Sequence, residues 1–137
     1  MEAERFEVAG GTLVYDTFGK PDAARAVLLI HGFAGDRLSW LDVGARLGER
    51  HFVIVPGLPA HGDTTLEEDD VERLHLVLQP LLEELGVAAE GLDIVGISMG
   101  GIVATRLAEA LLARGRTPRS LTLIASAGLG LECNQAA

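Results

Sequence analysis

The sequence predicts an α/β protein with a mostly parallel sheet of about six strands flanked by helices. Short apolar runs rich in Val, Ile and Leu alternate along the chain with segments whose apolar residues recur at helical spacing. Strands that alternate with helices imply right-handed crossovers and parallel neighbours in the sheet. The 137 residues suffice for one ordinary domain, which we place at residues 1–130, with a tail at residues 131–137.

Three strands are predicted before the first helix. Residues 6–8 and 12–18 predict two strands around the Gly10-Gly11 pair, which is a hairpin signal. The run AVLLI at residues 26–30 is apolar throughout, as expected of a strand that is buried on both faces. The chain is therefore expected to begin with a hairpin and then to enter the interior of the sheet.

A helix and a fourth strand follow. Ser39 and Asp42 have the spacing of a capping box, which predicts a helix that begins there and continues to about Leu47. Residues 52–55 (FVIV) predict the next buried strand, and a loop rich in proline and glycine comes after it.

A second helix is predicted from Thr65 to Gly86. The acids at residues 67–70 lie at its positive end, where the helix dipole favours them, and leucines and valines then recur at helical spacing. Pro80 is expected to kink this helix, and Gly86 to end it.

The last predicted elements surround the most specific motif of the sequence. Residues 92–95 predict a strand, residues 99–114 a helix and residues 121–125 a final strand. Between the first two lies GISMG at residues 96–100, which fits the G-x-S-x-G nucleophile elbow. In such an elbow the serine occupies a strained strand-to-helix turn, and the flanking glycines prevent collisions with neighbouring elements. Ser98 is therefore the candidate catalytic nucleophile.

Two backbone N–H groups are the candidate oxyanion hole. The N–H of Met99 lies at the start of the helix that follows the nucleophile, where free N–H groups and the helix dipole face a developing negative charge. His31-Gly32-Phe33 follows the strand at residues 26–30, and an H-G-type loop at that place supplies a second donor. We predict that the N–H groups of Phe33 and Met99 bind the oxyanion.

These motifs together resemble those of the α/β-hydrolase superfamily over residues 6–130. The resemblance rests on four phrases that occur in order, namely HGFAG, LPAHG, GISMGG and SLTLIASAGLG. It implies the first six core strands of that superfamily, and serine hydrolase or carboxylesterase activity on small esters without a cofactor. The last phrase, at residues 120–130, is also similar to hydrolase-like acyltransferase components of acetoin dehydrogenase complexes. Gly57 departs from the pattern, because the family usually has an aspartate there.

The sequence does not complete a catalytic triad. In the superfamily the acid and the histidine follow the nucleophile, but no histidine follows Ser98, and Glu109 and Glu132 are the only acids there. The chain therefore resembles a truncated α/β-hydrolase core, roughly the N-terminal half of the family pattern. Since a serine hydroxyl needs a base, the alternatives are His31, His61, a base from another chain, or no base.

Two functions and one kind of assembly remain as hypotheses. The first function is a serine esterase, and the alternative is a catalytically impaired hydrolase-fold fragment that acts as a binding or assembly module. The strand from Leu121 to Ala125 would normally lie inside the sheet and is left here as an apolar edge. We expect a homo-oligomer through this strand, or a second chain that supplies the missing strands.

Composition argues against several other classes. The formal net charge of −9 disfavours binding to nucleic acid and to anionic membranes. No run approaches about 18 apolar residues, and the N-terminus lacks the pattern of a signal peptide, so we expect a cytoplasmic protein. The one cysteine, Cys133, cannot form an internal disulfide or build a cysteine-rich zinc site. We interpret the acids at residues 67–70 as a helix cap and expect no metal site.

Overall fold

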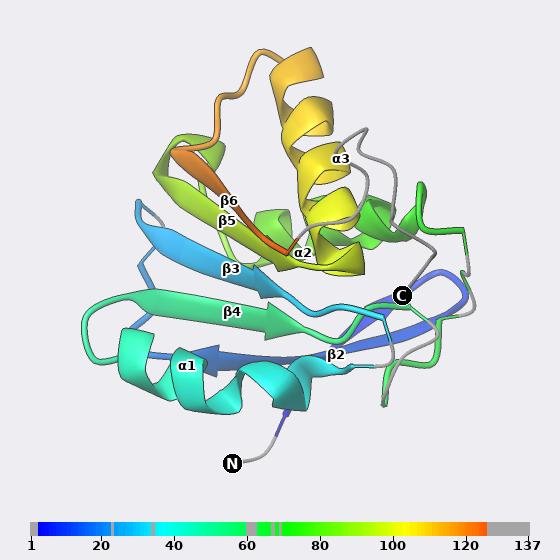
Figure 1. Cartoon of the computed structure of the whole chain (residues 1–137), viewed down its shortest axis with the longest axis horizontal. Helices are drawn as coiled ribbons and strands as arrows, with labels where there is room; N and C mark the ends of the chain where they lie inside the picture. The colour runs from blue at the N-terminus through cyan, green and yellow to red at the C-terminus, as the bar shows by residue number, and fades with distance from the viewer. Residues whose placement is uncertain are drawn as a thin grey trace, which may run out of the picture.

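A six-stranded sheet with helices on both faces forms the computed structural model of the chain. The structure describes residues 3–22, 24–33, 35–59, 63–66, 68 and 70–125. Helix α1 covers one face of the sheet, and helices α2 and α3 cover the other (Figure 1). The predicted α/β class is confirmed, while the predicted tail lies outside the described residues.

The strands follow one another in the order β1-β2-β4-β3-β5-β6 across the sheet. Strand β1 pairs with β2, and β2 with β4, in antiparallel fashion, and the remaining neighbours are parallel. Each predicted strand is present, with ends within two residues of the prediction. The strands are β1 (Glu4–Val8), β2 (Gly11–Phe18), β3 (Ala26–Ile30), β4 (Phe52–Pro56), β5 (Leu92–Ile97) and β6 (Ser120–Ile124). The helices are α1 (Leu41–Leu47), α2 (Leu78–Glu84) and α3 (Met99–Ala113), with 3-10 helices η1 (Arg37–Trp40), η2 (Leu74–Val77) and η3 (Ala89–Gly91).

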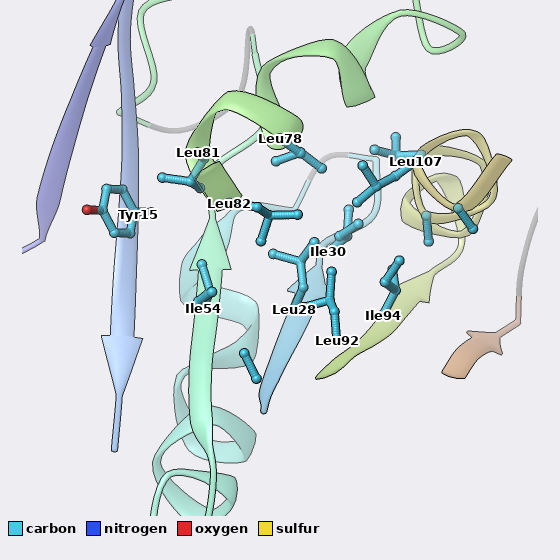
Figure 2. Packing of buried hydrophobic residues seen from close by; sticks show 14 of the residues in the cluster. Tyr15, Leu28, Ile30, Ile54, Leu78, Leu81, Leu82, Leu92, Ile94 and Leu107 are labelled. Atoms are coloured by element: carbon cyan, nitrogen blue, oxygen red, sulfur yellow. The ribbon is translucent and has the colours of Figure 1, made fainter. Parts of the chain in front are cut away.

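The central strands are buried on both faces, which explains their uninterrupted apolar sequences. Val27 of β3 and Val53 of β4 pack in the cluster on the α1 side. Leu28 and Ile54, one position further along each strand, pack in the cluster on the α2 and α3 side. Figure 2 shows this second cluster, in which Leu28 and Ile54 face leucines of α2 while Leu107 of α3 closes the other side. Because side chains alternate along a strand, each central strand contributes residues to two separate hydrophobic clusters, one on each face of the sheet.

The first helix begins differently from the prediction. The residue at the cap is Asp36, whose side chain accepts a hydrogen bond from the Leu38 N–H at 2.9 Å. Ser39 completes this capping box from the third helical position by accepting the Asp36 N–H at 3.4 Å. The prediction of a box that opens at Ser39 is therefore wrong by three residues, because Ser39 is the partner in the box and not its cap.

The predicted helix at Thr65 does not form there. Thr65 Oγ1 instead accepts the Thr12 N–H of β2 at 2.9 Å, and Thr64 Oγ1 accepts the Val14 N–H at 3.0 Å. The two threonine hydroxyls therefore accept hydrogen bonds from N–H groups of β2 that strand β4 does not reach. A hydroxyl that is used in this way is not available to cap a helix. The described residues between 63 and 73 contain no helix, and the first helical turn is η2.

Pro80 does not kink a long helix, contrary to the prediction. It is the third residue of α2, in the first turn, where a backbone N–H has no intrahelical acceptor in any case. Gly86 follows α2 with φ +70°, and the Val87 N–H donates to the Leu82 carbonyl at 2.9 Å. The predicted end of this helix at Gly86 is confirmed.

Candidate active site

Ser98 lies on the tight turn between β5 and α3, at the carboxyl end of the parallel strands. Its backbone has φ +53° and ψ −122°, a conformation that costs a non-glycine residue strain energy. The Ser98 N–H donates to the Ile124 carbonyl of β6 at 3.0 Å, and the Ser98 carbonyl accepts the Gly101 N–H at 2.9 Å. Neighbouring elements on both sides therefore hold the turn in its strained form, with the serine exposed.

The glycines on either side of Ser98 are required by close contacts between backbones. A Cβ atom on Gly96 would lie 2.3 Å from the carbonyl oxygen of Gly100. A Cβ atom on Gly100 would lie 2.4 Å from the His31 carbonyl oxygen and 2.5 Å from that of Ile30. The predicted steric requirement for these two glycines is confirmed, since helix α3 begins in direct contact with the end of β3.

The loop after β3 contacts the turn that carries Ser98. A Cβ atom on Gly32 would lie 3.2 Å from Ser98 Cβ and 3.8 Å from Ser98 Oγ. Phe33 follows Gly32 with an exposed side chain, and Met99 is the first residue of α3, where an N–H has no intrahelical acceptor. The structure thus places Phe33, Ser98 and Met99, the three residues singled out from the sequence, at the same end of the sheet.

His31 is completely buried, and both of its ring nitrogens contact backbone groups. The Leu58 N–H donates to Nε2 at 3.0 Å, so Nε2 carries no proton in this arrangement. Nδ1 then carries the proton and lies 2.9 Å from the Gly32 carbonyl oxygen, to which it donates. The imidazole therefore ties the loop after β3 to the loop after β4, which is a structural role and leaves neither nitrogen to act as a base in this geometry.

The other three histidines occupy different places. His61 lies outside the described residues. His51 precedes β4, at the opposite end of the sheet from Ser98, with Nδ1 at 3.2 Å from the Leu47 carbonyl oxygen. His75 lies on η2, where burial and then the charge of Arg106 lower the pKa of its imidazole. Arg106 is about two helical turns along α3 from Ser98. His75, which feels the charge of Arg106, therefore lies beside the middle of α3 and away from Ser98.

Sequence reasoning missed a charge cluster beside the loop after β3. Asp16 of β2 is only 2% exposed, and the Arg37 guanidinium of η1 bonds to its carboxylate. The second guanidinium nitrogen of Arg37 lies 3.2 Å from Oδ2 of Asp63, a carboxylate on the surface. The signal in the sequence was Asp16 itself, a charged residue inside an otherwise buried strand, because such a residue needs a partner.

Gly57 has its own backbone support at the position where the family pattern has an aspartate. The Gly57 N–H donates to the Val14 carbonyl at 2.8 Å, and Thr64 Oγ1 donates to the Gly57 carbonyl at the same distance. A Cβ atom at this glycine would lie 3.0 Å from Thr64 Oγ1. The threonine therefore fills the space and supplies the hydrogen bond on this side of the loop.

No group of three or more His, Cys, Asp or Glu side chains that could hold a metal ion occurs in the described part of the chain. Two of the four acids at residues 67–70 are described, and both have local partners: Glu68 pairs with Arg73 at 3.2 Å, and Asp70 accepts the Glu72 N–H at 3.0 Å. Within the same described ranges, no helix has the length and apolar character needed to cross a membrane.

Comparisons with known proteins identify a family and several relatives to which the chain is similar. A model of the alpha/beta hydrolase family matches residues 27–135. Over 96% of its length the chain is 37% identical to a dihydrolipoyllysine-residue acetyltransferase component of the acetoin cleaving system from Pseudomonas putida. Over 84% of its length it is 34% identical to monoacylglycerol lipase abhd6-A from Xenopus laevis. The chain spans about a third of the length of these curated relatives, because it covers 34% of each.

Solved structures match the same region of the fold. The crystal structure of a bacterial membrane phospholipase A superposes on the chain with a TM-score of 0.83 and 27% sequence identity. The match covers 97% of this chain and 42% of the phospholipase chain.

Proposed function

Because the chain belongs to the alpha/beta hydrolase family, we propose that Ser98 is the nucleophile of a serine hydrolase acting on small esters. Ser98 Oγ attacks the ester carbonyl carbon, and the N–H groups of Phe33 and Met99 stabilise the oxyanion that forms. The alcohol leaves with a proton, and water then hydrolyses the acyl-enzyme to release the acid and restore the serine. Support for an ester substrate comes from the name of one relative, a monoacylglycerol lipase.

The observation that carries this proposal is the strained conformation of Ser98 between two glycines at which a Cβ atom would collide with backbone atoms. A backbone strained at φ +53° persists only where its surroundings enforce it, and such strain is typical of functional turns. The contact of Gly32 with Ser98 adds support, because it puts the loop of Phe33 beside the nucleophile.

The proton of Ser98 must pass to a general base. Both nitrogens of His31 contact backbone groups, which argues against this residue as the base. We therefore assign the base either to His61 or to a histidine of another polypeptide. If neither supplies it, the alternative function applies, in which the fold is a catalytically impaired binding or assembly module.

The nucleophile assignment predicts that a fluorophosphonate probe labels the protein and that Ser98→Ala abolishes the labelling. The probe requires an activated serine, so labelling measured by intact-protein mass spectrometry reports directly on the hydroxyl of Ser98. Hydrolysis of p-nitrophenyl acetate and butyrate should fall to the uncatalysed rate in the same variant.

Ser120→Ala is the matched control, because Ser120 begins β6 at the other end of the sheet and bonds to Asp93. We expect this variant to react like the unmodified protein. Turnover that persists in Ser98→Ala would overturn the nucleophile assignment. A wild-type protein that resists labelling while remaining folded would favour the binding or assembly module.

We also propose that the chain associates with a second copy through β6. Leu121 and Ile124 of this strand are 39% and 42% exposed, and β5 is the strand that pairs with β6 among the described residues. A strand edge with free N–H and C=O groups and apolar side chains is a template for pairing with another strand. A two-fold axis beside β6 would extend the sheet across both copies.

Sedimentation velocity at micromolar concentration is expected to show a dimer that Leu121→Lys converts to a monomer. Lysine on a strand edge opposes pairing because its charge would have to be buried in the joint sheet. Leu112→Lys, which alters an exposed leucine of α3, should leave the dimer intact. A wild-type monomer would refute dimerisation through β6 and would leave a separate polypeptide as the partner of this edge.

A further inference from the structure

A concavity of about 530 Å³ lies at the end of the sheet opposite Ser98. It is formed by the loop between β2 and β3 and by the loop between α1 and β4, both on the left in Figure 1. The polar residues that line it are Lys20, Asp22, Arg25, Glu49, Arg50 and His51. No step of the proposed ester hydrolysis uses this end of the molecule.

The two loops that form the concavity are fixed against each other through their backbones. Gly19 has φ +78°, and a Cβ atom there would lie 2.1 Å from the His51 carbonyl oxygen and 2.7 Å from that of Gly48. The N–H groups of Arg50 and His51 both donate to the Leu47 carbonyl, at 3.1 and 2.9 Å. The walls are therefore preorganised, which lowers the cost of ordering them around a ligand.

Three cations of this concavity lack the carboxylate partners that most cations of the chain have. In the described ranges, six arginines lie within 4.0 Å of a carboxylate: Arg37, Arg73, Arg106, Arg114, Arg116 and Arg119. Lys20, Arg25 and Arg50 are exposed and make no such ion pair within those ranges. Their positive charge is thus uncompensated by ion pairs in a chain whose formal net charge is −9.

Two carboxylates, those of Asp22 and Glu49, also line the concavity, so three cations stand against two anions there. Asp22 Oδ1 accepts the Ala24 N–H at 2.9 Å, so this group also shapes its own loop. The guanidinium groups of Arg25 and Arg50 present paired N–H donors that match phosphate oxygens, and Lys20 adds a point charge. A volume of about 530 Å³ is that of a small-molecule site and exceeds the needs of an isolated ion.

We propose that this concavity binds the phosphate group of a small phosphorylated molecule. Lys20, Arg25 and Arg50 contact the phosphate oxygens, and Asp22 and Glu49 accept hydrogen bonds from hydroxyl groups on the organic part. This binding site is independent of Ser98, because it lies at the amino ends of β3 and β4 and needs no catalytic step.

The test is a titration of the ¹⁵N-labelled protein with inorganic phosphate and, separately, with glycerol 3-phosphate at constant ionic strength. Saturable shifts of the Gly19 and Gly48 amide signals are expected with both probes. Tighter binding of glycerol 3-phosphate would indicate a phosphorylated organic ligand, whereas equal binding would indicate free phosphate as the ligand of this site.

Variants then locate the site. Lys20→Gln combined with Arg50→Gln should raise the Kd at least about tenfold, because two contacts with a dianion are lost. Arg5→Gln, which removes an exposed arginine of β1 without an ion pair in the described ranges, should leave the Kd unchanged. Shifts that fail to saturate, or an equal Kd in the double variant, would overturn the proposal. These outcomes do not depend on whether Ser98 reacts.

Discussion

Replacing Arg37 by methionine is expected to lower the free energy of unfolding by about 3–5 kcal/mol. The variant would leave the carboxylate of Asp16 inside the protein without a partner, since Asp16 is 2% and Arg37 only 13% exposed. An unpaired buried charge costs far more than the pair gains, which is why the loss is large even though ion pairs in general stabilise little. Asp63 contributes a minor part of the effect, because its carboxylate is exposed to solvent. Urea unfolding, with the midpoint compared at an unchanged m value, measures the difference.

Two further variants separate the buried charge from the loss of an arginine as such. Arg46→Met removes an exposed arginine from the last turn of α1 and should change stability by about 0.5 kcal/mol or less. Arg37→Met combined with Asp16→Leu should recover most of the lost stability, because an apolar pair can replace a buried ion pair at little cost. If Arg37→Met proved no more destabilising than Arg46→Met, the ion pair with Asp16 would not hold this part of the fold.

The central strands could be predicted because they are buried on both faces of the sheet. The runs at Ala26–Ile30 and Phe52–Pro56 are apolar without interruption. A continuous apolar run of that length between loops is typical of a strand that is buried on both faces. The amphipathic pattern also predicted helix α3, whose apolar residues meet the sheet along one stripe. The local sequence was sufficient to predict an element wherever its buried residues recur with the period of a strand or of a helix.

The prediction of a helix that begins at Thr65 was wrong because the contacts that set the conformation of this segment are distant in sequence. Thr64 and Thr65 bond to backbone N–H groups of β2 that lie about fifty residues earlier in the chain. A threonine followed by acids looks the same whether its hydroxyl caps a helix or satisfies a strand edge. Only the placement of β2 beside this loop distinguishes the two uses.

The site was predictable in its backbone and not in its supporting side chains. G-x-S-x-G between a strand and a helix located Ser98, since the strained turn demands glycines at fixed positions. The partner of His31 could not be identified from the sequence, because the hydrogen bond depends on the loop of Leu58 lying within reach of Nε2. Arg37 was missed for the same reason: Asp16 and Asp63, its partners, belong to two other segments.

Gly100→Ala is expected to destabilise the fold by about 3 kcal/mol or more, and to displace the turn of Ser98 at the same time. The added Cβ would lie 2.4 and 2.5 Å from two carbonyl oxygens of β3 and its loop, and backbone atoms cannot move aside as a flexible side chain can. The start of α3 must therefore shift away from β3, which carries Ser98 away from the loop of Phe33.

Gly10→Ala separates this collision from the general cost of a Cβ atom. Gly10 has φ +95° and nothing within 4 Å of an added Cβ, so its substitution introduces strain alone, about 1–2 kcal/mol. Thermal or urea unfolding of both variants compares the two costs. Equal losses in Gly100→Ala and Gly10→Ala would mean that α3 can move off β3 freely. The close approach of these backbones would then not be what holds Ser98 in its strained conformation.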